Sequence, residues 1–143
     1  MLKFPFTIKN QFLTSLSTLE ASQNLRQEIL NYQRNFYKQA KRAGEDADIE
    51  GYVFGTDDDQ ARTYHLAELL RRHKVDLYDL NRDLSVDGKT FKSGSSYVIP
   101  SDQNQYRFVK ALFERRTSFS DSLFYDVSAW TMPYAFNLPF AEL

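Results

Sequence analysis

The chain contains no cysteine, only four prolines and five glycines among its 143 residues, and no long apolar run. Without cysteine, a disulfide scaffold, a thiolate zinc finger and a cysteine nucleophile are excluded. No stretch approaches the ~18 apolar residues of a membrane span, so we expect none. Residues 1–9 lack the apolar core of a signal peptide, and any export signal would therefore lie upstream.

Neither sign of charge is in excess, since 18 basic residues stand against 19 acidic ones and leave a net charge of -1. Nucleic-acid binding usually needs a basic excess, and we expect no nucleic-acid partner. Three short basic clusters, at 38–42, 71–74 and 115–116, all fall at expected helix C-termini. There the helix dipole explains them without a polyanion.

The composition is that of a folded protein, with 42% hydrophobic and 15% aromatic residues. We divide the chain into an N-terminal segment with a long connecting helix, residues 1–44, and an α/β domain, residues 45–143. Apolar residues recurring at helical spacing predict the long helix from about Ser17 to Gly44. Ser17 and Glu20 have the capping-box pattern, and Gly44 is expected to adopt the left-handed C-terminal cap.

A strand, a helix and a second strand follow. Gly51–Gly55 is an apolar run bounded by glycines, which predicts a buried strand. Thr56 or Asp57 is expected to cap a helix to about Lys74, and Val75–Leu80 predicts the next strand. Such a unit indicates two parallel strands. The inward-facing candidates of this helix are Ala61, Tyr64, Leu69 and Leu70.

A β-hairpin comes next, because Asp87 and Gly88 separate the short runs Leu84–Val86 and Lys89–Phe91. Tyr97–Pro100 predicts a further strand, which its proline ends. Ser101 or Asp102 is then expected to cap a third helix, with an apolar face formed by Tyr106, Val109, Leu112 and Phe113. Together these elements predict an α/β fold with a small, partly parallel sheet and packed helices.

The last 27 residues, from Thr117 to Leu143, contain no lysine or arginine and are rich in aromatics. A segment of this composition is expected to pack on its own domain, on a second copy or on a neighbouring domain. The aromatic residues are Phe119, Phe124, Tyr125, Trp130, Tyr134, Phe136 and Phe140.

His65 and Glu68 have a spacing that can place two zinc ligands side by side. A catalytic zinc needs a third ligand, and His73 lies about 12 Å further along the same expected helix. Ordinary helix-surface roles are the alternative. The acidic run Asp57–Asp59 could hold Mg²⁺ or Ca²⁺, but acidic residues in a first helical turn also cap it.

Nucleotide and serine-hydrolase motifs are not found. The turn after Gly51–Gly55 has neither G-x-G-x-x-G nor a P-loop lysine, and its aspartates would repel a phosphate. Gly94, Ser95 and Ser96 do not form a G-x-S-x-G elbow and predict a turn.

Two long stretches, residues 94–107 and 121–133, together with Tyr52–Gly55, resemble a region of known proteins. The resemblance is to the region that follows the catalytic domain in zinc carboxypeptidase-like proteins (the carboxypeptidase A family) of Bacteroidetes-type bacteria. It implies a layer similar to the glutamine-amidotransferase or flavodoxin fold, with the helix Thr14–Gly44 leaving the peptidase domain. It also implies a parent protein that acts in the periplasm or outside the cell.

The resemblance implies no catalytic residue in this chain. The family's zinc lies in the preceding domain, on His-x-x-Glu and a distant histidine, whereas His65 and Glu68 match only the spacing. The amidotransferase nucleophile would be a cysteine, which the chain lacks. We therefore expect no cofactor in this chain and zinc in the parent's catalytic domain.

The leading hypothesis is a non-catalytic accessory domain that supports or orients the peptidase domain or its substrate. Its partner would be that domain or a second copy of the chain. The candidate interface residues, which are equally good core candidates, are Phe124, Tyr125, Trp130 and Tyr134.

Two hypotheses of other classes stay open. One is a small metal-dependent hydrolase that uses His65, Glu68 and the acidic run Asp57–Asp59. The other is a small-ligand binding module at the strand ends near Gly55 and Asp79.

Overall fold

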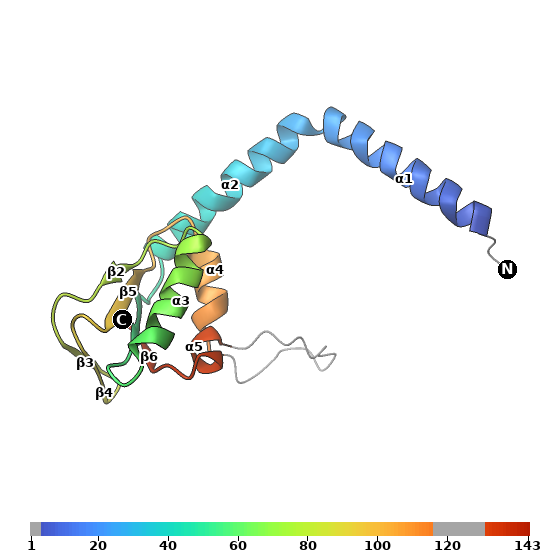
Figure 1. Cartoon of the computed structure of the whole chain (residues 1–143). Helices are drawn as coiled ribbons and strands as arrows, with labels where there is room; N and C mark the ends of the chain where they lie inside the picture. Colours follow the sequence, from blue (N-terminus) through green and yellow to red (C-terminus); the bar gives the residue numbers. More distant parts are fainter. Residues whose placement is uncertain (1–3, 116–130) are drawn as a thin grey trace, which may run out of the picture. The chain divides into compact units, whose positions relative to one another are not determined.

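The computed structural model describes residues 4–115 and 131–143, and these form two compact units, 1–37 and 38–143. The first unit is helical, and the second combines helices with a four-stranded sheet (Figure 1). The mixed helix-and-sheet architecture and the long N-terminal helical segment predicted from the sequence are confirmed. Along the described ranges, no helix is long and apolar enough to cross a membrane.

The N-terminal segment forms two helices, α1 (Phe4–Asn24) and α2 (Arg26–Glu45), which meet at Leu25. The predicted start at Ser17 is wrong, because α1 begins 13 residues earlier and Ser17 lies within it. Two hydrogen bonds at the junction keep the helical pattern: the amide of Leu25 donates to the carbonyl of Ala21 at 2.8 Å, and the amide of Ile29 donates to the carbonyl of Leu25 at 2.9 Å. Leu25 itself belongs to neither helix, so the continuous helix predicted from the sequence is divided there.

Gly44 does not have the expected left-handed cap conformation. It lies inside α2 and is not among the described residues with positive φ. A Cβ added at this position would clash with the carbonyl oxygen of Ser101 and lie 3.0 Å from Cγ of Tyr106. Gly44 is thus required by the close approach of α2 to the loop at Ser101, which no local pattern reveals.

The sheet has the order β2 (Tyr78–Asp79), β5 (Ser96–Pro100), β1 (Gly51–Gly55), β6 (Phe140–Glu142). Every bonded pair of strands is antiparallel, with Val53 opposite Val98 on one side and Ala141 on the other. The predicted partly parallel sheet is therefore wrong, and so is the parallel sheet that a flavodoxin-like layer requires.

The physical reason is the position of β5. Both β1 and β2 run antiparallel to β5, so the two point in the same direction, as a strand–helix–strand crossover demands. However, β5 lies between them and takes their hydrogen bonds. The two strands of the unit therefore run in the same direction, as predicted, but no two parallel strands are bonded to each other in the described sheet.

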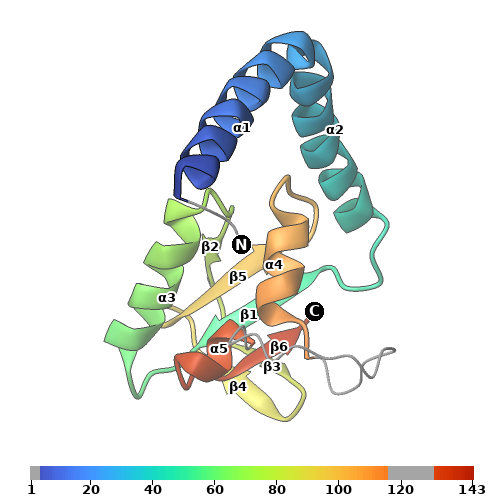
Figure 2. The same ribbon diagram turned by 90° about the vertical axis from the view of Figure 1, so that its right-hand side faces the viewer.

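The two faces of β1 bury different cores, which explains why this strand is apolar throughout. Tyr52 and Phe54 pack with helices α3 (Gln60–Arg72) and α4 (Tyr106–Phe113), which lie across one face of the sheet (Figure 2). Val53 packs on the other face with Leu80, Phe91 and Ala141.

Two local predictions for the helices hold only in part. The α3 helix exists, but its cap is Asp59, whose Oδ1 accepts from the amide of Arg62 at 2.9 Å. Its buried residues are Thr63, Leu66, Ala67 and Leu70, so of the predicted inward set only Leu70 is buried, and Tyr64 is 51% exposed. The α4 helix has the predicted face, with Tyr106, Val109 and Phe113 buried, but it begins after Gln105 rather than at Ser101 or Asp102.

The hairpin is confirmed with its predicted bounds, β3 (Leu84–Val86) and β4 (Lys89–Phe91). Asp87 and Gly88 have φ of 51° and 70°, the backbone that this tight turn needs. In the C-terminal segment, α5 (Met132–Ala135) precedes β6. The buried residues Leu138, Phe140 and Ala141 of this segment belong to the domain's own core clusters, and Pro133 is buried in α5.

Candidate functional site

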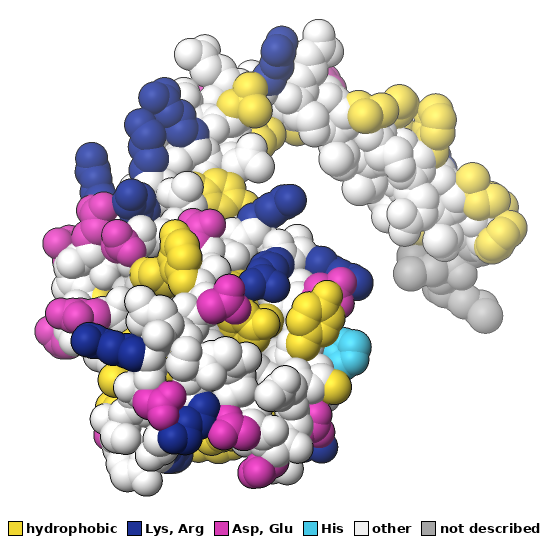
Figure 3. Space-filling view, turned by 60° about the vertical axis from the view of Figure 1, so that its left-hand side comes forward, with side chains coloured by type: hydrophobic (Ala, Val, Ile, Leu, Met, Phe, Trp, Pro, Cys, Tyr) yellow, Lys and Arg dark blue, Asp and Glu magenta, His cyan; other side chains and the backbone are white. Residues whose placement is uncertain are grey.

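The helical arm, defined as residues 4–37, is the largest apolar feature that the described residues leave in solvent (Figure 3). No residue of α1 is buried. Eleven large apolar residues of the arm are between 47% and 78% exposed: Phe4, Phe6, Ile8, Phe12, Leu13, Leu16, Leu19, Leu25, Ile29, Leu30 and Tyr32.

The exposed apolar area of the arm has the size of a protein interface. Large apolar side chains that are about half exposed, repeated eleven times, amount to on the order of 1,000 Å². This total is divided among several sides of the arm, and a specific complex buries about 800 Å² on each partner. The arm therefore has the character of a binding surface.

Seven of the eleven apolar residues form two stripes. Ile8, Phe12, Leu16 and Leu19 follow one another at helical spacing in α1, and Leu25, Ile29 and Tyr32 do so in α2. The step from Leu19 to Leu25 is six residues, and at about 100° per residue it would turn the second stripe by roughly 120° from the first along an unbroken helix. One narrow helix could not cover both stripes, but a broad folded surface could.

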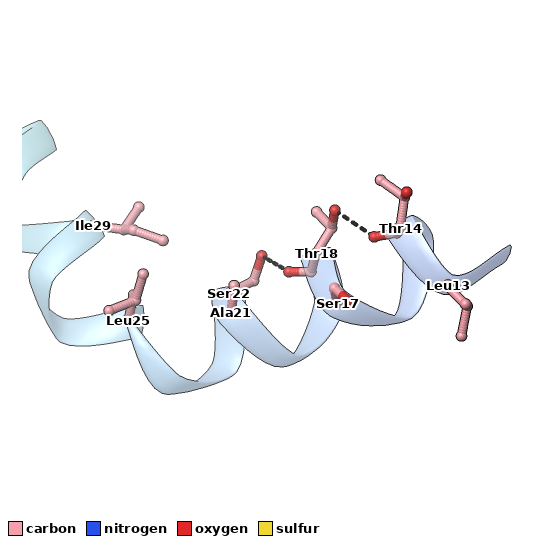
Figure 4. A pocket seen from close by; sticks show the side chains of 8 residues that line it. All are labelled: Leu13, Thr14, Ser17, Thr18, Ala21, Ser22, Leu25 and Ile29. Atoms are coloured by element: carbon pink, nitrogen blue, oxygen red, sulfur yellow. Dashed lines mark hydrogen bonds between the residues drawn. The ribbon is translucent and has the colours of Figure 1, made fainter. Parts of the chain in front are cut away.

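A hollow of about 470 Å³ runs along the arm across the junction of α1 and α2. Figure 4 shows Thr14, Thr18 and Ser22 pointing to the same side of the arm. The hydroxyls of Thr18 and Ser22 donate to the carbonyls four residues earlier, at 2.8 and 2.7 Å. Such back-bonding bends helices and leaves these hydroxyl protons already bonded. The small residues lining the hollow are Thr14, Ser17, Thr18, Ala21 and Ser22, and the larger ones are Leu13, Leu25 and Ile29.

The sequence reasoning missed most of this surface, because it started the helix at Ser17 and regarded the segment as a connection. The spacing of Phe4, Ile8, Phe12 and Leu16 was the signal that could have extended the helix to its true start.

The structure does not bring His65 and Glu68 together with a third ligand. His65 is exposed on α3, with its ring 6.0 Å from that of Tyr64. The carboxylate of Glu68 accepts from the guanidinium of Arg72 at 2.7 Å. Within residues 4–115 and 131–143, no three His, Asp or Glu side chains are placed to hold a metal ion.

The acidic run after β1 is divided among separate tasks. Asp59 caps α3 and pairs with Arg62, its Oδ2 lying 3.1 Å from Nη2. Asp57 accepts a hydrogen bond from the hydroxyl of Ser95, a buried residue in the turn before β5. The amide of Asp58 donates to the hydroxyl of Thr56. The carboxylates of Asp57 and Asp59 thus bind different partners, and the acidic run is not arranged as one metal site.

A second charged group lies nearby in the loops around the hairpin. Asp83 accepts from Nζ of Lys92 at 2.7 Å and from the amide of Ser93 at 3.0 Å. The hydrogen bond from Lys92 holds the pKa of the Asp83 carboxyl below its usual value, and the same bond raises the pKa of Lys92. This pair ties the hairpin loops together and is exposed to solvent, so screening limits its strength.

Of the predicted interface residues, the structure describes one. Tyr134 lies in α5, is 59% exposed and has its ring 5.2 Å from the ring of Phe140. Phe124, Tyr125 and Trp130 lie outside the described residues. At the strand ends, Gly55 and Asp79 both lie in the sheet, Gly55 buried in β1 and Asp79 exposed in β2.

Comparison of the chain with protein-family models, with curated proteins and with solved structures gave no match in any of the three.

Proposed function

We propose that this chain is a non-catalytic accessory domain of a zinc carboxypeptidase-like protein, and that the helical arm binds it to the catalytic domain. The observation that carries the proposal is the exposed apolar arm, whose area matches that of a protein interface. The choice of partner follows from the sequence resemblance of residues 52–55, 94–107 and 121–133, which is itself part of the proposal.

The division of the apolar residues into two stripes favours a folded domain as the partner. A second arm in a two-stranded coiled coil would cover a single continuous stripe. Here the stripe of α1 and the stripe of α2 face different directions, so a broad surface must contact the arm on two sides. A catalytic domain provides such a surface.

The proposal also accounts for the sparse charge of α1. Lys9 and Glu20 are its only charged residues, and charged residues are depleted at the centres of protein interfaces. The second unit, residues 38–143 and called the compact unit below, would then be held next to the catalytic domain, where it could support that domain or orient its substrate.

The test is a binding measurement with the zinc carboxypeptidase-like catalytic domain encoded in the same genome. The full chain is titrated into that domain by calorimetry, and a complex of defined stoichiometry is expected. Replacing both Phe12 and Leu19 by serine should weaken binding by more than about tenfold, because buried aromatic and aliphatic anchors dominate interface energies.

The matched control replaces Asn10 and Asn24, two polar residues on the opposite side of α1 from the stripe Ile8–Leu19, by serine. We expect this variant to bind within about twofold of the unmodified chain. Since Phe12 and Leu19 are 62% and 68% exposed, neither variant should change the melting of the compact unit. Absence of binding by the unmodified chain, or equal binding by both double variants, would contradict the proposal.

A further inference from the structure

The strand β6 is one edge of the four-stranded sheet, since the described residues place β1 on one side of it and no strand on the other. An edge strand presents N–H and C=O groups to which another chain can add a strand. The other edge, β2, has only two residues, Tyr78 and Asp79, and both are exposed. A short, charged edge of that kind is already protected, so β6 is the edge that needs protection.

The hydrogen bonds between β1 and β6 show which groups of β6 face the open side. The carbonyl of Pro139 and the amide of Leu143 both bond to β1, at 3.2 and 2.9 Å. Bonded and non-bonded residues alternate along an antiparallel pair, so Ala141, midway between them, also bonds to β1. The backbone groups of Phe140 and Glu142 therefore point away from β1, toward the open edge.

Two cationic side chains lie at this edge. Nζ of Lys89, in strand β4 of the hairpin, donates to the outward carbonyl of Phe140 at 2.7 Å and lies 5.7 Å from the centre of its ring. The guanidinium of Arg115, just after α4, lies 5.1 Å from the same ring. It also lies 3.9 Å from the carboxylate of Asp87 in the hairpin turn. The hairpin and the end of α4 thus both contact the edge residue Phe140.

We infer that Lys89 blocks the edge at β6 and so prevents a second copy of the chain from adding its own β6 to the sheet. This inference does not depend on the proposed function, because every residue in it belongs to the compact unit.

A second copy is the occupant that this edge fits, because the edge is complementary to itself. Two β6 strands related by a twofold axis at Ala141 would place Phe140 of each copy opposite Glu142 of the other. Both residues have outward N–H and C=O groups, so each pair could exchange two hydrogen bonds. With Lys89 in place, one of those carbonyls is already bonded, and pairing would bring two ammonium groups close together and desolvate them.

The first experiment removes the block in the full chain. Lys89→Met keeps a long side chain but removes the charge and the donor, and it should self-associate at concentrations at least about tenfold lower than the unmodified chain in sedimentation equilibrium. Lys92→Met is the matched control, because Lys92 has the same charge in the adjacent loop but bonds to Asp83 instead of a strand. It should differ from the unmodified chain by less than about twofold. Lys89→Thr, with a residue favoured in strands, is the second variant if Lys89→Met does not fold.

The second experiment locates the contact by hydrogen exchange of backbone amides. Exchange at Phe140 and Glu142 should slow as the concentration of Lys89→Met is raised, because these amides would donate to the second copy. Adding Glu142→Pro to Lys89→Met removes an outward donor and no bond to β1, and proline is accepted in edge strands at such positions. Association of this double variant should return to the level of the unmodified chain.

Three results would overturn the inference. A folded Lys89→Met or Lys89→Thr chain that associates no more strongly than the unmodified chain would show that Lys89 only ties the hairpin to the sheet. An equal gain in association for Lys92→Met would show a general effect of net charge. Association without slower exchange at Phe140 and Glu142 would place the contact elsewhere, such as on the helical arm.

Discussion

Replacing Gly44 by alanine tests the structure against the local interpretation of the sequence, because the two predict stability changes of opposite sign. Inside an exposed helix, glycine to alanine stabilises by about 1 kcal/mol through helix propensity. In the structure, however, Gly44 and Ala40 are the buried residues of α2, one turn apart. The added Cβ would overlap the carbonyl oxygen of Ser101 and lie 2.8 Å from its carbonyl carbon.

The magnitude follows from what must move. The atoms in the way belong to the backbone of Ser101, and the ring of Tyr106 closes the other side at 3.0 Å, so no flexible side chain can yield. Overpacking at a site of this kind costs roughly 1–3 kcal/mol, and a backbone clash lies at the upper end. After the gain in propensity, we expect Gly44→Ala to destabilise the compact unit by about 2 kcal/mol, or roughly 10 °C in Tm.

The assay is thermal unfolding of the full chain followed by calorimetry and by circular dichroism. Ala43→Gly is the matched control, since Ala43 is the exposed neighbour in the same helix and should lose no more than about 1 kcal/mol. An alanine variant that melts at or above the temperature of the unmodified chain would refute the close approach of α2 to Ser101.

Two further predictions concern the core and a loop. Burial, with the nearby carboxylate of Glu142, raises the pKa of Tyr52 to about 12. An unfolded tyrosine ionises near pH 10, so this contribution to stability is complete below about pH 10 and is lost as the pH rises toward 12. Between about pH 9 and about pH 11.5, the urea midpoint of the unmodified chain should therefore fall more steeply with pH than the midpoint of Tyr52→Phe. Equal slopes for the two proteins would contradict this. The buried side-chain amide of Gln103 makes two hydrogen bonds to the backbone of Asp76. Its Oε1 accepts from the Asp76 N–H at 2.9 Å, and its Nε2 donates to the Asp76 carbonyl at 3.0 Å. Gln103→Ala should cost about 1–3 kcal/mol in urea unfolding, and more than Gln105→Ala, whose residue makes an exposed bond; the reverse order would refute this reasoning.

The candidate site was predicted least well, for reasons that are also physical. His65 and Glu68 have the correct spacing for two ligands, yet spacing along one helix says nothing of a third ligand from elsewhere in the chain. The arm was predicted as a helix but regarded as a connection, since periodicity shows that a face is apolar and does not show whether the fold covers it. Only the exposed fractions of residues such as Phe12 and Leu19 decide that question.

The sequence by itself determined those elements whose information is local. Asp87 and Gly88 specify the hairpin because few residues accept two successive positive φ angles, and the glycine-bounded apolar run of β1 is strand-like without its neighbours. The tertiary structure alone decided which elements meet. The short strand β6 exists because β1 offers it hydrogen bonds, and β5 separates β1 from β2. Likewise Gly44 is glycine because Ser101, 57 residues later, approaches it. Pairing and close packing depend on residues far apart in the chain, and no local propensity encodes them.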